Sequence, residues 1–177
     1  MIAAFDVADL FEPIDDEHIT VRHTASGLRC QFYSDETTAR LVVFSGLARG
    51  EDVGCVSETA DQARTLYATR YPGEITPAQA MADAVASIRN RFADARPTSA
   101  RLHMQSEDLP DVMDRHFLIT LRDEQWLTSV FVAAHEGWII KLRFTARAVD
   151  EDAIRAAQLE ANAAFTVALL RLVEAAP

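Results

Sequence analysis

The chain has 177 residues, of which 49% are hydrophobic and 25% are charged, which is the composition of an ordinary globular protein. Its formal net charge of −10 argues against nucleic acid or an anionic membrane as a partner, because phosphate binding needs a basic surface. No apolar run approaches the ~20 residues of a membrane span, so we expect a soluble protein.

A single domain over residues 1–177 is expected from this length. Residues 1–16 mix apolar and acidic residues and define no clear element, although a short helix is compatible with them. The run from Met1 to Phe5 is too short for a secretory signal, and Asp6 interrupts it. We therefore expect a cytoplasmic protein, with a periplasmic or secreted location as the alternative if the chain start is truncated.

The first part of the chain is predicted to form short strands, because polar and apolar residues alternate in it or form compact apolar runs. Ser26 and Gly27 separate the first two of these strands. The predicted strands cover residues 18–23, 28–33, 41–45, 53–57 and 65–71.

The two cysteines, Cys30 and Cys55, both lie in predicted strands. We expect reduced, buried thiols, because free cysteine behaves as a small hydrophobic residue. A disulfide is the alternative and would indicate an oxidising compartment. His18 and His23 lie near Cys30, but a Cys–His nucleophile needs a hydrogen bond that sequence proximity does not supply.

The clearest helix start in the chain is at Thr76. Its hydroxyl can accept from the amide of Gln79, the Gln79 side chain can reach back to the Thr76 amide, and Pro77 takes the first helical position. Pro97 marks the end of this helix. Its predicted buried stripe is Met81, Ala84, Val85, Ile88 and Phe92.

The pattern weakens between residues 98 and 114. Ala100, Leu102 and Met104 alternate as a candidate edge strand, and an acidic loop follows. The loop and its neighbour supply five candidate metal ligands: Glu107, Asp108, Asp111, Asp114 and His116. A calcium loop also needs a glycine at its sharp turn and a fixed ligand spacing, and neither is present. We favour a solvated acidic loop and expect no metal or cofactor.

Three adjacent antiparallel strands are expected next, at residues 117–121, 126–134 and 138–147. The last strand alternates with a period of two, so one of its faces is expected to be buried. Glu136 and Gly137 can form a two-residue turn, since glycine tolerates positive φ. With that turn, His135 pairs with Trp138 and the register of the whole hairpin is fixed.

The register gives the hairpin two different faces. One face is apolar and is expected to lie under a helix: Leu127, Phe131, Ala133, Trp138, Ile140, Leu142 and Phe144. The reverse face mixes aliphatic and polar residues, and its candidate partner-binding residues are Val130, Val132, Ile139, Lys141 and Arg143. We favour the first helix as the cover of this face. The alternative leaves its aliphatic patch for a second chain, such as a homodimer partner. Lys141, Arg143 and Arg147 are expected to be ordinary solvent-facing residues rather than an anion site.

A long helix closes the chain, from Asp150 as its N-cap to about Val173. Glu151 and Asp152 suit the positive end of the helix dipole. The apolar stripe that should lie on the Leu142 face is Ile154, Ala157, Ala161, Phe165, Ala168 and Leu172.

The order of elements predicts an α+β fold, with an antiparallel sheet and two main helices packed on it. The segments TLYATRYPGEITPAQAMADAVASIRNRFADARP, GWIIKLRFTARA and SGLRC resemble stretches of an uncharacterised family of proteobacterial proteins, which implies no activity. From about Ile19 to Val173, the architecture also resembles the Mog1/PsbP-like α/β/α sandwich. That resemblance implies a binding or assembly factor rather than an enzyme.

The chain contains no HExxH, GxSxG, Walker, GxGxxG or paired CxxC motif. We therefore expect a non-catalytic module that binds a protein or a small molecule. The alternative is a small hydrolase whose site is assembled from distant residues, with His116 or His135 and a carboxylate such as Asp114. A deep cleft with a histidine bonded to a carboxylate would favour the enzyme. We expect no histidine in a hydrogen-bonded triad with a serine or cysteine nucleophile.

Overall fold

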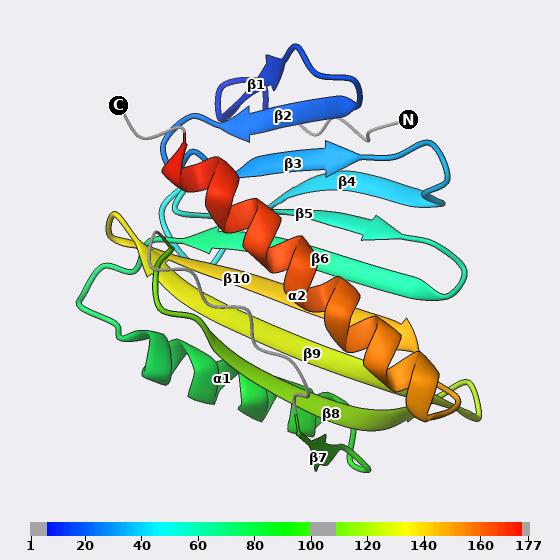
Figure 1. Cartoon of the computed structure of the whole chain (residues 1–177). Helices are drawn as coiled ribbons and strands as arrows, with labels where there is room; N and C mark the ends of the chain where they lie inside the picture. The colour runs from blue at the N-terminus through cyan, green and yellow to red at the C-terminus, as the bar shows by residue number, and fades with distance from the viewer. Residues whose placement is uncertain (1–6, 100–108, 175–177) are drawn as a thin grey trace.

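The computed structural model describes residues 7–99 and 109–174, which form two antiparallel sheets and two helices (Figure 1). The α+β prediction is confirmed. The smaller sheet has the order β1-β2-β3, and the larger has the order β4-β5-β6-β10-β9-β8-β7. The strands are β1 (Phe11–Ile14), β2 (Ile19–His23), β3 (Arg29–Phe32), β4 (Thr38–Val43), β5 (Asp52–Glu58), β6 (Gln62–Thr69), β7 (Arg96–Thr98), β8 (Met113–Leu121), β9 (Glu124–His135) and β10 (Trp138–Arg147). The helices are α1 (Pro77–Arg91) and α2 (Glu151–Val173).

The β9–β10 hairpin forms in the predicted register. His135 pairs with Trp138, and Phe131 therefore lies beside Leu142. Both turn residues have positive φ, 47° at Glu136 and 79° at Gly137, which is the backbone that a two-residue turn between twisted strands requires.

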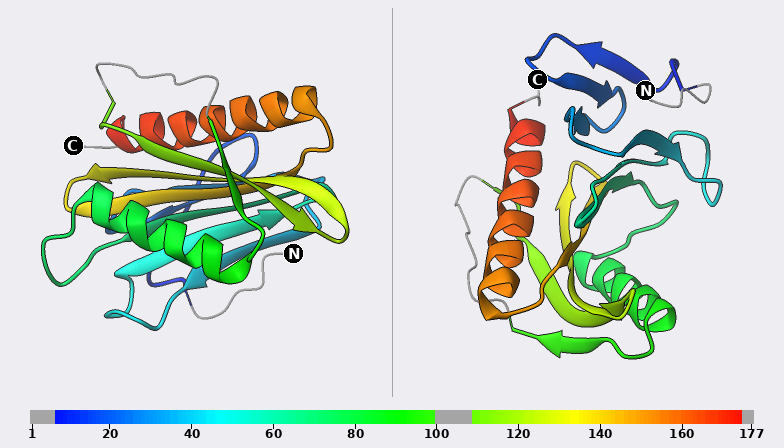
Figure 2. Two further views of the ribbon diagram at one scale, coloured as in Figure 1. Left: turned by 90° about the horizontal axis from the view of Figure 1, so that it is seen from below. Right: turned by 90° about the vertical axis from the view of Figure 1, so that its right-hand side faces the viewer.

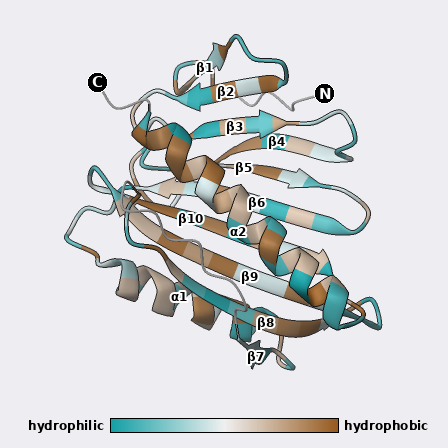
Figure 3. Cartoon of the chain, viewed as in Figure 1, coloured by the Kyte–Doolittle hydropathy of each residue, from teal (hydrophilic) through white to brown (hydrophobic). Residues whose placement is uncertain are grey.

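Helix α2 lies on the Leu142 face of the large sheet, and Phe165 packs against Phe131 with the two ring centroids 5.5 Å apart. Figure 3 shows hydrophobic stretches along β9 and β10, the strands that this helix crosses. Close packing of this kind suits the small residues of the helix, Ala157 and Ala161, which are both buried. The N-cap at Asp150 is also as predicted, since its side chain accepts from the backbone N–H of Ala153 at 2.8 Å.

Helix α1 covers the opposite face, so the large sheet has a helix on each side (Figure 2). It begins with the predicted capping box at Thr76. The side chains of Met81 and Ile88 pack on the aliphatic residues of the reverse face, Val130, Val132 and Ile139. Those three residues are therefore covered within the chain itself, which is the arrangement that we favoured over an exposed patch.

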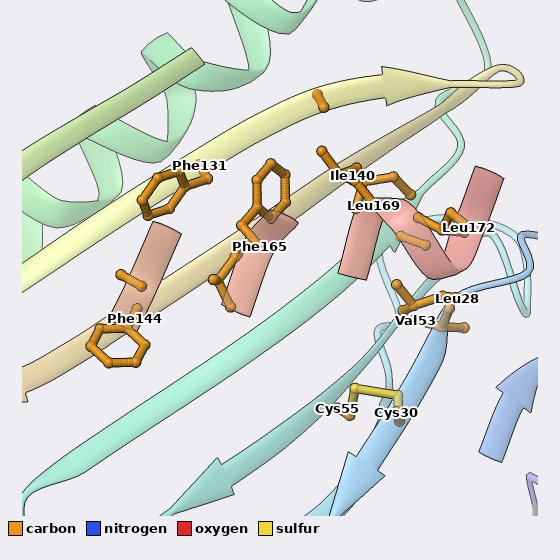
Figure 4. Packing of buried hydrophobic residues seen from close by; sticks show 14 of the residues in the cluster. Leu28, Cys30, Val53, Cys55, Phe131, Ile140, Phe144, Phe165, Leu169 and Leu172 are labelled. Atoms are coloured by element: carbon orange, nitrogen blue, oxygen red, sulfur yellow. A yellow bond between two sulfur atoms is a disulfide. The ribbon is translucent and has the colours of Figure 1, made fainter. Parts of the chain in front are cut away.

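Cys30 on β3 and Cys55 on β5 form a disulfide, so the expectation of reduced thiols was wrong. Both cysteines lie in the predicted strands, but β3 and β5 belong to different sheets. The small sheet packs over the large one and brings the two Cα atoms to 5.9 Å, which is within bonding range. Figure 4 shows the bond beside the core residues Leu28 and Val53.

Three local features differ from the sequence-based expectations or extend them. Residues 11–14 form strand β1 instead of part of a short helix. Pro97 lies in β7 at the outer edge of the large sheet, where a missing N–H breaks no ladder. The candidate edge strand at residues 100, 102 and 104 lies outside the described residues. Within the described ranges, no helix is long and apolar enough to cross a membrane.

Candidate functional site

A groove with a volume of about 280 Å³ lies between α2 and β3, above β5, β6 and β10. Its floor comes from the large sheet and is mainly apolar: Cys55, Leu66, Leu142 and Phe144. The wall formed by α2 carries Ala163, Ala164, Val167 and Ala168, and these small side chains leave the space open. The groove therefore exists because α2 presents alanines where the small sheet leans over the large one.

Charged residues stand at both ends of the α2 wall. Arg171 and Glu160 are 11 positions apart, which corresponds to about 16 Å along a helix. Glu160 accepts from the side-chain amide of Gln62 at 2.6 Å. The groove thus has a cationic end and an acidic end, with apolar residues between them.

Arg64, which also lines the groove, is neutralised by an acidic partner. It forms an ion pair with Glu36, a side chain that is only 4% exposed, and donates to the hydroxyl of Ser57. A third, longer contact of 3.4 Å reaches the backbone oxygen of Gln31, on the open edge of β3. Because its charge is compensated, Arg64 is a structural residue that holds β3 to the large sheet.

Arg29 and Arg171 differ from Arg64, because neither has a carboxylate within ion-pair distance among the described residues. Arg171 donates to Oε1 of Gln31 at 2.9 Å, and the hydroxyl of Tyr33 donates to the same oxygen at 2.8 Å. Arg29 lies on the same face of β3 as Gln31 and lines the same groove. Its Nε is buried and has no hydrogen-bond partner in the described part of the chain.

Arg171 interacts electrostatically with Asp16, in the turn before β2. The backbone N–H of Glu17 is the main cause that lowers the pKa of Asp16, with Thr20 and Arg171 adding to it. Asp16 is exposed to solvent, so it compensates Arg171 only weakly. A net positive charge therefore remains at this end of the groove, in a protein whose overall charge is −10.

The sequence-predicted partner-binding residues lie elsewhere, on the side of the large sheet that faces α1. Lys141 and Arg143 are half-buried, and burial lowers the pKa of both groups. Lys141 Nζ lies 4.5 Å from the ring centre of Tyr67, and the Arg143 guanidinium lies 5.8 Å from that of Phe92. The two cations are thus packed beside aromatic rings and are not the fully solvated row that we expected. Arg147 is exposed and pairs with Glu124 at 2.6 Å.

His116 is bonded to both Asp114 and Ser129, so the expectation that no histidine would form such a triad was wrong. The Nδ1 atom lies 2.7 Å from the Ser129 hydroxyl, and Nε2 lies 2.7 Å from the Asp114 carboxylate. These contacts form because the β8–β9 register places His116 directly opposite Ser129. Asp114, two residues before His116, lies on the same face of β8.

The burial of Ser129 and His116 argues against a catalytic role for this triad. Ser129 has no exposed surface, and His116 is 4% exposed. A serine nucleophile must reach its substrate, whereas this hydroxyl lies within the sheet beside Phe131, whose ring packs edge-on against His116. The arrangement satisfies buried polar groups. His135, the other candidate, is partly exposed next to the β9–β10 turn.

Two other regions differ from this groove. In residues 7–99 and 109–174, no group of three histidine, cysteine or acidic side chains is placed to hold a metal, and Glu107 and Asp108 lie outside these ranges. A second hollow lies beside the loop before α1 and the β9–β10 turn, where Glu74 is its single charged lining residue. Of these two hollows, the groove under α2 combines an apolar floor with uncompensated charge.

No protein family model matches the chain, and no curated protein matches it. The absence of a match is consistent with the uncharacterised family that the sequence resembles. Among solved structures, the chain is similar to LpqN of Mycobacterium tuberculosis, which is described as involved in cell envelope biogenesis. The two share 14% identity with a TM-score of 0.44, over 96% of this chain and 94% of that chain. Likeness at this level assigns neither a family nor a function.

Proposed function

We propose that the protein is a non-catalytic binding module and that the groove under α2 holds a small anionic molecule. The observation that carries the proposal is the uncompensated pair Arg29 and Arg171 at one end of the groove, with the Arg29 Nε buried and unpartnered. A guanidinium is suited to carboxylates and other oxyanions, because its planar fork offers parallel donors. A bound anion would supply the partner that Arg29 lacks.

The groove also has the size of a site for a small ligand. Its volume of about 280 Å³ lies near the lower end of the range for ligand pockets, roughly 300–1,000 Å³. The wall and floor are fixed by α2 and by the disulfide from β3 to β5, so the site is formed before any ligand binds. Binding then costs little reorganisation.

The proposal is tested by titrating the protein with benzoate and with its neutral isostere benzamide. Chemical-shift changes in NMR spectra monitor the binding of each compound. We expect benzoate to shift resonances of β3 and α2, and benzamide to bind at least tenfold more weakly. Arg29→Gln and Arg171→Gln should each weaken benzoate binding. Arg40→Gln, which removes an exposed arginine outside the groove, is the matched control and should change nothing. Equal binding of benzoate and benzamide would contradict the proposal.

The disulfide favours an oxidising compartment over the cytoplasm, because disulfides persist where thiols are not kept reduced. We therefore propose a periplasmic or secreted location in place of the cytoplasmic default. The helices on both faces of the sheet also support the Mog1/PsbP-like resemblance, whose members are binding factors. Membership of that group stays a prediction.

The hydrolase alternative is supported by one observation, the hydrogen-bonded set Asp114, His116 and Ser129. It is tested by incubating the folded protein with a fluorophosphonate probe, which labels activated serines. We expect no labelling, since Ser129 is buried. Labelling that disappears in the Ser129→Ala variant would establish the hydrolase instead.

A further inference from the structure

We infer that the ligand of the groove is an amphiphile, with an anionic head at Arg29 and Arg171 and an aliphatic chain that runs along α2. This inference rests on the proposed function and adds the chemical class of the ligand. It follows from what lies between the charged ends of the groove. The floor there consists of Leu66, Leu142 and Phe144.

The wall opposite this floor is also apolar and is partly open to solvent. Val167 lines the groove and is 44% exposed, because the alanines beside it on α2 are too small to cover it. Burial of such a side chain against an alkyl chain removes apolar surface from water on both partners. A compact polar anion would leave Val167 as exposed as it is in the free protein.

The charges fix the direction in which such a ligand lies. Glu160, at the far end of the α2 wall, repels an anionic head. Arg64 already has Glu36 as its partner, so it offers little charge to a ligand. The head is therefore placed at the Arg171 end, and the chain points toward Phe144.

The volume limits the length of the chain. The groove volume of about 280 Å³ lies just below the usual range for ligand pockets, so we expect an alkyl chain of about seven carbons beyond the carboxylate to fill it. Longer chains extend past the groove, so each added carbon increases the affinity by a smaller factor.

The experiment is a calorimetric titration of the full chain with the straight-chain carboxylates from butanoate to decanoate, below their micelle-forming concentrations. Each added methylene should raise the affinity roughly three- to fourfold, as expected for its transfer out of water. The increase should level off near octanoate. Octan-1-ol, which has the chain without the charge, should bind at least tenfold more weakly than octanoate.

Val167→Asn tests the chain contact, and Leu159→Asn is the matched control. Both residues lie on α2 and are similarly exposed, at 44% and 41%, but Leu159 does not line the groove. We expect Val167→Asn to weaken octanoate about tenfold and to leave benzoate nearly unchanged, while Leu159→Asn changes neither.

The outcomes separate the inference from the proposed function. If benzoate binds through Arg29 and Arg171 but the carboxylates show no dependence on chain length, the amphiphile inference is wrong and the anion site stands. If octan-1-ol binds as tightly as octanoate, the head assignment is wrong. If neither benzoate nor any of the straight-chain carboxylates binds, the proposed anion site and the amphiphile inference are both wrong.

Discussion

Cys30 and Cys55 are bonded to each other from two different sheets, and this bond is the covalent link between the small sheet and the large one. Arg29 and Gln31 flank Cys30 on β3, whereas Cys55 contributes to the groove floor. The disulfide therefore sets the position of the cationic end of the groove relative to its apolar floor.

The first prediction concerns these cysteines. Thiol titration of the unfolded protein without reductant should find no reactive groups. The Cys30→Ser, Cys55→Ser double variant should lose about 3 kcal/mol of stability, as expected when a link across 25 residues is removed from the unfolded chain. Two reactive thiols per chain would contradict the bond.

The second prediction is a loss of stability at mildly acidic pH, caused by His23. Its Nδ1 accepts from the backbone N–H of Ser26 at 3.2 Å, and its Nε2 is buried without a partner among the described residues. Burial lowers the pKa of His23 from 6.5 to about 4. As the pH falls below 6.5, the unfolded chain takes up a proton before the folded protein does.

The free energy of unfolding should therefore be highest above pH 6.5 and fall by roughly 2 to 3 kcal/mol between pH 6.5 and pH 4. Below pH 4 the fall should level off, because the folded protein then takes up the same proton. Urea denaturation across this range measures it. The slope should be reduced in His23→Gln. An unchanged slope in that variant would assign the effect to other groups.

The third prediction tests the face assignment of the hairpin. Leu142 is 2% exposed and lies in the core beneath α2. Leu142→Ala should cost about 2 to 5 kcal/mol, as large-to-small changes in a core do. Chemical denaturation measures it, and a loss below about 1 kcal/mol would mean that this face is not packed.

The fourth prediction concerns the reverse face. Val132 has no exposed surface under α1, so Val132→Glu places an unpaired carboxylate in a core. We expect the variant to unfold or to melt at a much lower temperature. If the Val132→Glu protein were instead stable and monomeric while the wild-type protein formed an oligomer, the result would support the alternative in which this face binds a second chain.

Local signals in the sequence predicted much of the fold. The spacing of Thr76 and Gln79 placed the start of α1, and the turn at Glu136 and Gly137 was enough to set the register of β9 and β10. Each of these signals acts within a few residues. Their meaning does not depend on how distant parts of the chain pack.

The features that the sequence did not predict depend on distant contacts. The bond between Cys30 and Cys55 requires the small sheet to pack over the large one. The contact between His116 and Ser129 depends on the β8–β9 register, which the four residues between the predicted strands do not determine. The groove combines Arg29 with Arg171, which are more than a hundred positions apart in the chain.

The most direct test of the anion site is the affinity for octanoate of the wild-type protein, compared with the Arg29→Gln, Arg171→Gln double variant, by calorimetry at low salt. Circular dichroism and the melting temperature should confirm that the double variant is folded. The account predicts that the wild-type protein binds octanoate and that the double variant loses at least tenfold in affinity, while Arg40→Gln keeps it. Equal affinity in the wild-type protein and the double variant would contradict the account.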